Sequence, residues 1–155
     1  MFKVSNILLP TDFSRFSLSA ADCAVSLAKQ NDAVLHVLHV LEKTPPILTI
    51  RSLDLSQEKI IKSIEADAKK SLDNVLNEIK KLDQEIKIKG AIRKGIDYEE
   101  IIKYSKENKI DMIVIATHGR TGILHTLLGS VAEKVIRYSK IPVLVTTPEG
   151  KKNKK

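Results

Sequence analysis

Five short apolar runs, separated by longer segments with helical spacing, constrain the fold of this chain more than any other feature. Each run is too short for a typical helix, and three are dense in Val, Ile and Leu, as strands buried on both faces are. The run that begins at Ile86 alternates Ile with Lys, which predicts a half-exposed strand near a sheet edge. The five runs are Ile7 to Leu9, Ala33 to Leu41, Ile86 to Ile92, Met112 to Ala116 and Ile141 to Thr146.

Four helices are expected around these strands. Leu18, Ala21, Val25 and Ala28 form one apolar stripe, and a second stripe runs from residue 61 to residue 82. The second helix could pair with a coiled-coil partner, but packing on the domain's own sheet is favoured. Asp97 followed by Glu100 has the spacing of a capping box, which predicts a third helix start. A fourth helix follows Gly129 and is expected to bury Val131 and Val135, with Tyr138 as a further candidate.

Alternating strands and helices predict an α/β fold: a single-domain, doubly wound, parallel five-stranded sheet with helices on both faces, Rossmann-like in type. The chain has 155 residues, the length of one ordinary domain, and its 43% hydrophobic content is enough for one core. We place the domain at residues 1–148. The lysine-rich tail at 149–155 is expected to be disordered, and Lys43 to Leu55, which shows neither period, to be an exposed loop.

The net charge of +7 is a weak argument for nucleic-acid binding, because four lysines of the tail supply much of it. The chain has no Trp and only three Phe and three Tyr, so it lacks the aromatic platforms of single-strand binders. Cys23 has no partner for an intramolecular disulfide, which favours a reducing, cytoplasmic compartment. The apolar stretch near the N-terminus is too short for a signal peptide or a membrane span.

Two segments carry candidate chemistry, because ligands of doubly wound sheets bind outside the carboxyl ends of the strands. In the first, a buried strand runs into Pro10, Thr11 and Asp12; the alternative is that Asp12 or Ser14 merely caps the next helix. The second extends from residue 116 to residue 122 and resumes at Gly129. There a glycine turn and a helix start offer backbone N–H groups to a phosphate. His118 and Arg120 could add donors or be plain loop side chains.

Several other nucleotide and catalytic motifs are absent from the sequence. It contains no G-x-x-x-x-G-K-[ST] motif and no G-x-G-x-x-G after the first strand, which argues against a P-loop NTPase and a conventional dinucleotide fold. It also has no G-x-S-x-G elbow, H-E-x-x-H motif or paired-cysteine metal site. The phosphate-binding hypothesis therefore depends on the two segments above.

Motifs along nearly the whole chain resemble the universal stress protein family. The strand motifs alone are weak, and the glycine block is the specific part of the resemblance. The matching motifs are Ile-Leu-Leu-Pro-Thr-Asp at 7–12, Leu-His-Val-Leu at 38–41, Ala-Thr-His-Gly-Arg-Thr-Gly at 116–122, Leu-Leu-Gly-Ser-Val-Ala-Glu-Lys-Val-Ile at 127–136 and Ile-Pro-Val-Leu-Val at 141–145.

The resemblance implies an adenine nucleotide alpha-hydrolase-like fold that binds ATP, or AMP or ADP, with Mg²⁺ or Mn²⁺ held through the phosphates. The nucleotide-binding branch carries G-x-x-G, nine residues and G-[ST], and this chain departs from it with Ala116 at the first glycine. Adenine is expected near Asp12 and the backbone of Val40, with ribose and phosphates at the glycine block. The expected site residues are Pro10, Thr11, Asp12, Val40, Ile115, Ala116, His118, Gly119, Arg120, Gly129, Ser130 and Val131.

The resemblance leaves three functional hypotheses open. The leading one is a stress-response module, regulatory or protective, that binds an adenine nucleotide and an unidentified protein partner. The second is a slow ATPase in which Asp12 or His118 positions water, although the sequence shows no convincing base. The third is a nucleotide-free dimeric interaction protein, favoured by Ala116. Family members commonly pair through the last strand, and Ile141 to Thr146 would otherwise be an unpaired apolar edge, so we expect a homodimer.

Overall fold

The computed structural model describes residues 1–43, 55–117 and 128–147. The loop expected between Lys43 and Leu55 lies almost entirely outside these residues, as do the tail at 149–155 and His118, Gly119 and Arg120. Of that predicted loop the structure describes its two end residues: Lys43 is an exposed bend residue, as expected, whereas a helix already begins at Leu55.

A parallel sheet of five strands forms the centre of the fold, as predicted. Its strand order is β3-β2-β1-β4-β5, so β1 lies between β2 and β4. After β3 the chain crosses back over the sheet and forms β4 on the other side of β1. All four pairings are parallel. The strands are β1 (Asn6–Pro10), β2 (Val34–Leu41), β3 (Ile88–Lys94), β4 (Met112–Ala116) and β5 (Val143–Thr146).

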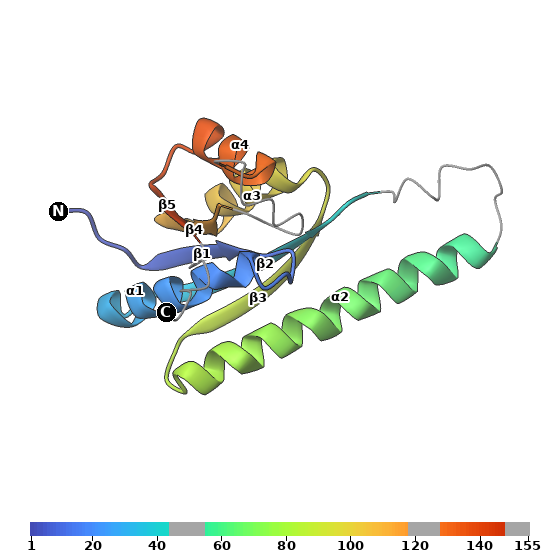
Figure 1. Cartoon of the computed structure of the whole chain (residues 1–155), viewed down its shortest axis with the longest axis horizontal. Helices are drawn as coiled ribbons and strands as arrows, with labels where there is room; N and C mark the ends of the chain where they lie inside the picture. Colours follow the sequence, from blue (N-terminus) through green and yellow to red (C-terminus); the bar gives the residue numbers. More distant parts are fainter. Residues whose placement is uncertain (44–54, 118–127, 148–155) are drawn as a thin grey trace, which may run out of the picture.

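Helices cover both faces of this sheet, also as predicted. In Figure 1, α1 and α2 lie on one side of the sheet and α3 and α4 on the other. The helical elements are a 3-10 turn η1 (Ser17–Ala20), α1 (Ala21–Asn31), α2 (Leu55–Leu82), α3 (Asp97–Glu107) and α4 (Ser130–Tyr138). Within the described part of the chain, no helix is long and apolar enough to cross a membrane.

Two hydrophobic clusters, one on each face, explain why the strands are almost wholly apolar. Successive side chains of a strand point to opposite faces, so Ile7 and Leu9 pack with α1 and α2 while Leu8 packs with α3 and α4. All three side chains are fully buried. By contrast, β3 lies at an edge and is mostly half-buried, which confirms the expectation from its alternating Ile and Lys residues.

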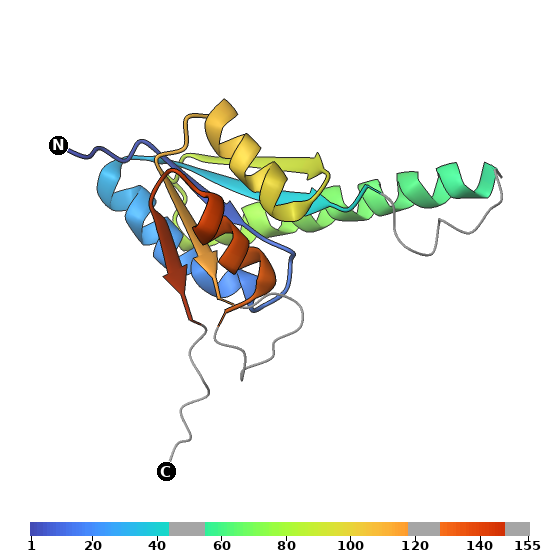
Figure 2. The same ribbon diagram turned by 90° about the horizontal axis from the view of Figure 1, so that it is seen from above.

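Helix α2 packs on the sheet through the predicted stripe, but along only part of its length. Ala68, Leu72, Val75 and Ile79 are buried, whereas Ile61 is 41% exposed. Figures 1 and 2 both show the N-terminal half of this helix extending beyond the sheet.

Two details of the helix predictions are wrong. Asp97 does not cap α3 through a capping box: Ile96 is the N-cap residue without a side-chain bond, and the Asp97 carboxylate accepts the Tyr98 N–H at 2.6 Å. Tyr138, in the last turn of α4, is 54% exposed rather than buried, although its ring stacks on that of Tyr98 with centroids 5.5 Å apart. The predicted start of α3 is nevertheless correct.

Candidate functional site

A cleft of about 480 Å³ opens at the carboxyl ends of the strands, between the start of α3 and the start of α4. It spans β1 and β4, the neighbouring strands between which the strand order reverses, where doubly wound sheets bind ligands. Nine of the twelve predicted site residues line it, and the other three lie outside the described residues. The nine are Pro10, Thr11, Asp12, Val40, Ile115, Ala116, Gly129, Ser130 and Val131.

The turn after β1, residues 11–17, is held by its own polar side chains; we call it the β1 turn. Thr11 Oγ1 and Ser17 Oγ lie 2.9 Å apart, and Thr11 Oγ1 accepts the Phe13 N–H at 3.0 Å. Asp12 Oδ1 accepts the Ser14 N–H at 2.9 Å, and Ser14 Oγ accepts the Ser17 N–H at 3.1 Å. The capping alternative is wrong, because the N-cap residues of η1 and α1 are Phe16 and Ala20, neither of which makes a side-chain cap bond. Asp12 instead holds the turn through Ser14, and it also lines the cleft.

On the opposite side of the cleft, β4 ends and α4 begins. Gly129 is the N-cap residue of α4, with φ −69° and ψ 151°, and its N–H donates to the Thr117 carbonyl at 2.6 Å. The first turn of α4 follows at Ser130, so the positive end of the helix dipole and the backbone N–H groups of that turn lie at the cleft. This end of the cleft suits an anionic group.

Part of the cleft lining is apolar. Leu38 and Val40 of β2, Ile101 of α3 and Ile115 of β4 all line it, and all four belong to or pack against the cluster on the α3 and α4 face. Ile64 of α2 lines it from another direction. A flat apolar group such as a nucleobase could be held against these side chains.

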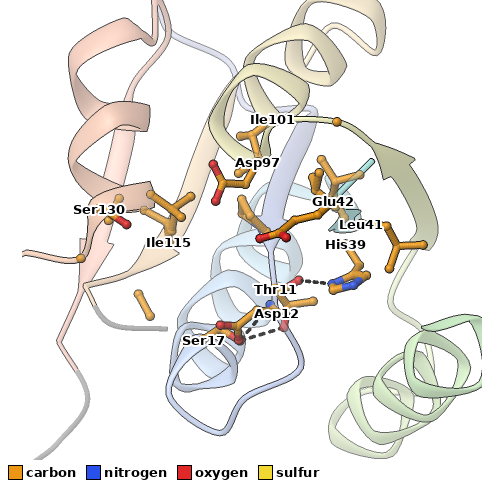
Figure 3. A pocket seen from close by; sticks show the side chains of 18 of the residues that line it. Thr11, Asp12, Ser17, His39, Leu41, Glu42, Asp97, Ile101, Ile115 and Ser130 are labelled. Carbon is orange, nitrogen blue, oxygen red and sulfur yellow. Dashed lines mark hydrogen bonds between the residues drawn. The ribbon is translucent and has the colours of Figure 1, made fainter. Parts of the chain in front are cut away.

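Three carboxylates line the cleft, and of these the sequence identified only Asp12. The other two are Glu42, directly after β2, and Asp97, at the first position of α3. Figure 3 labels all three side chains in the cleft, together with Ser130 at the start of α4. The described lining contains no Lys or Arg. The rule that ligands bind at strand ends, applied to β2 and β3 as well, could have found both residues.

Other lining residues that the sequence did not indicate include Ser17, His39 and Gly95, whereas Thr117, which also lines the cleft, belongs to the predicted segment 116–122. His39 is buried within β2 and donates from Nδ1 to the Thr11 carbonyl, 2.8 Å away. Among the described residues, no group of three or more His, Cys, Asp or Glu side chains is arranged to hold a metal ion. Any metal would therefore need ligands from a bound molecule or from other residues.

A parallel five-stranded sheet with a cleft at its switch point defines a Rossmann-like α/β protein, and comparison with known proteins identifies the family. The model of the universal stress protein family matches residues 3–147. Universal stress protein MJ0531 of Methanocaldococcus jannaschii is 36% identical over 141 residues, which cover 90% of this chain and 79% of that protein. The chain belongs to the universal stress protein family.

Solved structures agree with this assignment. The solved structure of hypothetical protein MJ0577 compares with this chain at a TM-score of 0.79 and 31% sequence identity. The match covers 97% of this chain and 99% of that one. A universal stress protein in complex with cAMP has a TM-score of 0.70 at 23% identity, covering 95% of this chain and 99% of its own. At that identity the likeness shows the fold alone.

Proposed function

We propose that this protein binds ATP, or a related adenine nucleotide, in the cleft and acts as a binding module of the stress response rather than as an efficient enzyme. The observation that carries the proposal is the composition of the cleft. Apolar side chains of β2, α3 and β4 line the cleft together with the N-terminus of α4 and three carboxylates. A 5′-nucleotide carries matching groups: an anionic phosphate, a sugar with hydroxyl donors and a flat base.

The phosphates fit best beside Gly129 and Ser130. Backbone N–H groups and the helix dipole favour negative charge there, and Gly129 has no side chain to keep a phosphate away. Mg²⁺ or Mn²⁺ would be held through the phosphates, since the described residues offer no cluster of ligands. The base then reaches Leu38, Val40 and Ile101. A universal stress protein of the same fold has been solved in complex with cAMP, which is itself an adenine nucleotide.

The carboxylates of Glu42 and Asp97 favour one orientation of the nucleotide in the cleft. A carboxylate accepts hydrogen bonds from the ribose hydroxyls or from the adenine amino group, but it repels a phosphate. Glu42 directly follows β2 and Asp97 begins α3, whereas Ser130 begins α4. The nucleotide is therefore oriented with its phosphates toward α4 and its uncharged part toward these carboxylates.

Mass spectrometry of the ligand released from protein purified without added nucleotide tests the proposal directly. We expect an adenine nucleotide, and titration calorimetry of the stripped protein with Mg-ATP should then show one site per chain. A timed phosphate-release assay should show turnover far below typical enzyme rates, which are about 10 s⁻¹. Protein that carries no nucleotide and does not bind Mg-ATP would be a nucleotide-free interaction protein instead.

We also propose that β5 pairs with its copy in a second chain. The carbonyls of Pro142 and Thr146 accept from Ile113 and Thr117, on the β4 side. Residues alternate along a strand, so the N–H and C=O groups of Val143 and Val145 point to the outer edge. Leu144 is 37% exposed beside this edge. An apolar edge strand of this kind is a ready template for pairing.

A further inference from the structure

His39 holds the β1 turn from the neighbouring strand, and it does so on both sides of Asp12. On one side, its Nδ1 lies 2.8 Å from the carbonyl oxygen of Thr11. On the other side, its ring stacks on the ring of Phe13, with centroids 4.1 Å apart and planes inclined by 26°. Figure 3 shows the His39 contact with Thr11 beside Asp12. One buried side chain therefore contacts both residues that flank a carboxylate of the cleft.

The backbone of the β1 turn needs such support, because Phe13 adopts the left-handed conformation with φ 66°. A bulky side chain is strained there, and glycine or asparagine would be the usual choice. Such strain persists where surrounding contacts over-determine the conformation. Here the contacts are the stack on His39 and the hydrogen bond from the Phe13 N–H to Thr11 Oγ1.

The tautomer of His39 follows from its partner. The Thr11 carbonyl can only accept a hydrogen bond, so Nδ1 carries a proton. The exposed fraction of His39 is 4%, and the Thr11 N–H is bound to the Leu38 carbonyl at 2.9 Å. The point where the chain leaves the sheet is thus fixed to β2 through both the N–H and the C=O of Thr11.

We propose that His39 is a positioning residue for the nucleotide site: through Thr11 and Phe13 it holds the Asp12 carboxylate at the cleft. The proposal deepens the proposed function and rests on it, since Asp12 is expected to meet the nucleotide. The Asp12 carboxylate also accepts the Ser14 N–H, so a displaced turn would release that hydrogen bond. His39 acts on the ligand through Asp12, which makes its effect measurable as a coupling between the two residues.

The first test is a double-mutant cycle with Mg-ATP titration on the full chain. His39→Leu removes the donor at similar volume, and Asp12→Asn removes the charge while keeping an oxygen that accepts from Ser14. We expect His39→Leu to weaken binding about tenfold, in line with an unpaired buried carbonyl. In the Asp12→Asn background it should change affinity by less than about twofold. His39→Asn, which keeps a donor near the Nδ1 position, should recover most of the affinity. Equal effects of His39→Leu in both backgrounds would show a general structural role and overturn the proposal.

The second test does not need a nucleotide. Amide hydrogen exchange of Ser14, compared with that of Leu8 in the core of β1, separates local opening of the turn from global stability. His39→Leu should raise this ratio about tenfold. His36→Leu is the matched control, because His36 is a buried histidine on the same strand that bonds Tyr104 and does not line the cleft. It should leave the ratio and the affinity unchanged.

The outcomes of the two tests are distinguishable. A folded His39→Leu protein with wild-type Ser14 exchange would refute the positioning role, whatever the nucleotide does. A wild type that binds no Mg-ATP would refute the proposed function and with it the role in nucleotide binding, while the exchange ratio would still decide whether His39 holds the turn. An effect of His36→Leu as large as that of His39→Leu would also overturn the proposal.

Discussion

The Ala116→Gly variant tests whether alanine at the first glycine of the nucleotide-binding motif prevents this chain from binding a nucleotide. Ala116 ends β4, is 5% exposed and pairs with Thr146. Among the described residues other than glycine, positive φ occurs at Phe13, Asp32 and Lys109, so Ala116 has an ordinary strand conformation. Its side chain belongs to the cluster on the α1 and α2 face. Glycine is therefore not needed at this position for its conformational freedom.

The magnitudes follow from this environment. Ala116→Gly removes one buried methyl group, worth about 0.8 kcal/mol, and adds about 0.5–1 kcal/mol of backbone entropy cost. We expect the variant to be less stable by about 1–2 kcal/mol and to bind Mg-ATP within about threefold of wild type. If alanine were strained here, glycine would instead tighten binding by about 1 kcal/mol or more, which is at least about fivefold.

Ala116→Val serves as the opposite perturbation. The two added carbons enter a packed cluster and should cost about 1–3 kcal/mol of stability. The displaced end of β4 should also weaken nucleotide binding, because the same residue lines the cleft. Urea unfolding and titration calorimetry in one buffer at one magnesium concentration measure both quantities. Binding that appears only in Ala116→Gly would refute the reasoning and place the chain in the nucleotide-free branch.

The remaining predictions address the cleft, the core and the sheet edge. Gly129→Val should abolish Mg-ATP binding in calorimetry while circular dichroism shows an intact fold, because φ −69° suits valine but its side chain would meet the phosphates; unchanged affinity would remove this site. Asp97→Asn should raise the affinity for adenosine 3′,5′-bisphosphate relative to that for AMP, because it removes a negative charge that repels the second phosphate. Glu99→Gln, on the same helix turn but outside the cleft lining, should leave this ratio of affinities unchanged. Burial and a nearby lysine lower the pKa of His36 below 6.5, so the unfolded chain binds that proton more readily. Urea unfolding should then show stability falling as the pH drops below 6.5, by at most about 1.4 kcal/mol per pH unit, and a His36→Gln protein should lack this slope. Val145→Pro should give monomers or aggregates in sedimentation, since it removes an outward N–H; a monomeric wild type at micromolar concentration would contradict the dimer.

The strands were predicted closely because burial on both faces leaves a strong signal in the sequence. The run from Met112 to Ala116 coincides with β4, and Ala33 to Leu41 differs from β2 by one residue. At the sheet edge the signal is weaker: the run was placed from Ile86 to Ile92, whereas β3 extends from Ile88 to Lys94. An alternating pattern marks an edge strand but does not fix where its pairing begins.

The start of α2 shows the limit of a method that depends on apolar periodicity. The stripe was recognised from Ile61, but the helix begins at Leu55. Residues 58–63 are all exposed, so no apolar stripe against the sheet marks this end of the helix. Periodicity reports the part of a helix that packs, and the exposed remainder has to be inferred from propensity and capping.

The candidate site was found where polar residues directly follow a buried run, as Asp12 follows β1. Glu42 and Asp97 were missed because their relevance depends on tertiary topology: the order β3-β2-β1-β4 places the end of β2 beside that of β1 and the end of β3 beside that of β2. His39 was missed for another reason. Inside a strand motif it has no local signal, and its contacts with the β1 turn come from the register between β1 and β2.

The net charge of the chain and the charges that line the cleft favour different kinds of ligand. A net charge of +7 would suggest a polyanionic ligand bound by basic side chains, yet the described lining contains three carboxylates and no Lys or Arg. Within the described residues, a feature that favours a phosphate is the N-terminus of α4, a partial positive charge from backbone dipoles that no count of side chains reveals. The dipole acts within about one helical turn, so it favours a phosphate at Gly129, whereas the carboxylates of Glu42 and Asp97, after β2 and at the start of α3, disfavour one. Local electrostatics, rather than net charge, should therefore decide which end of a nucleotide enters at α4.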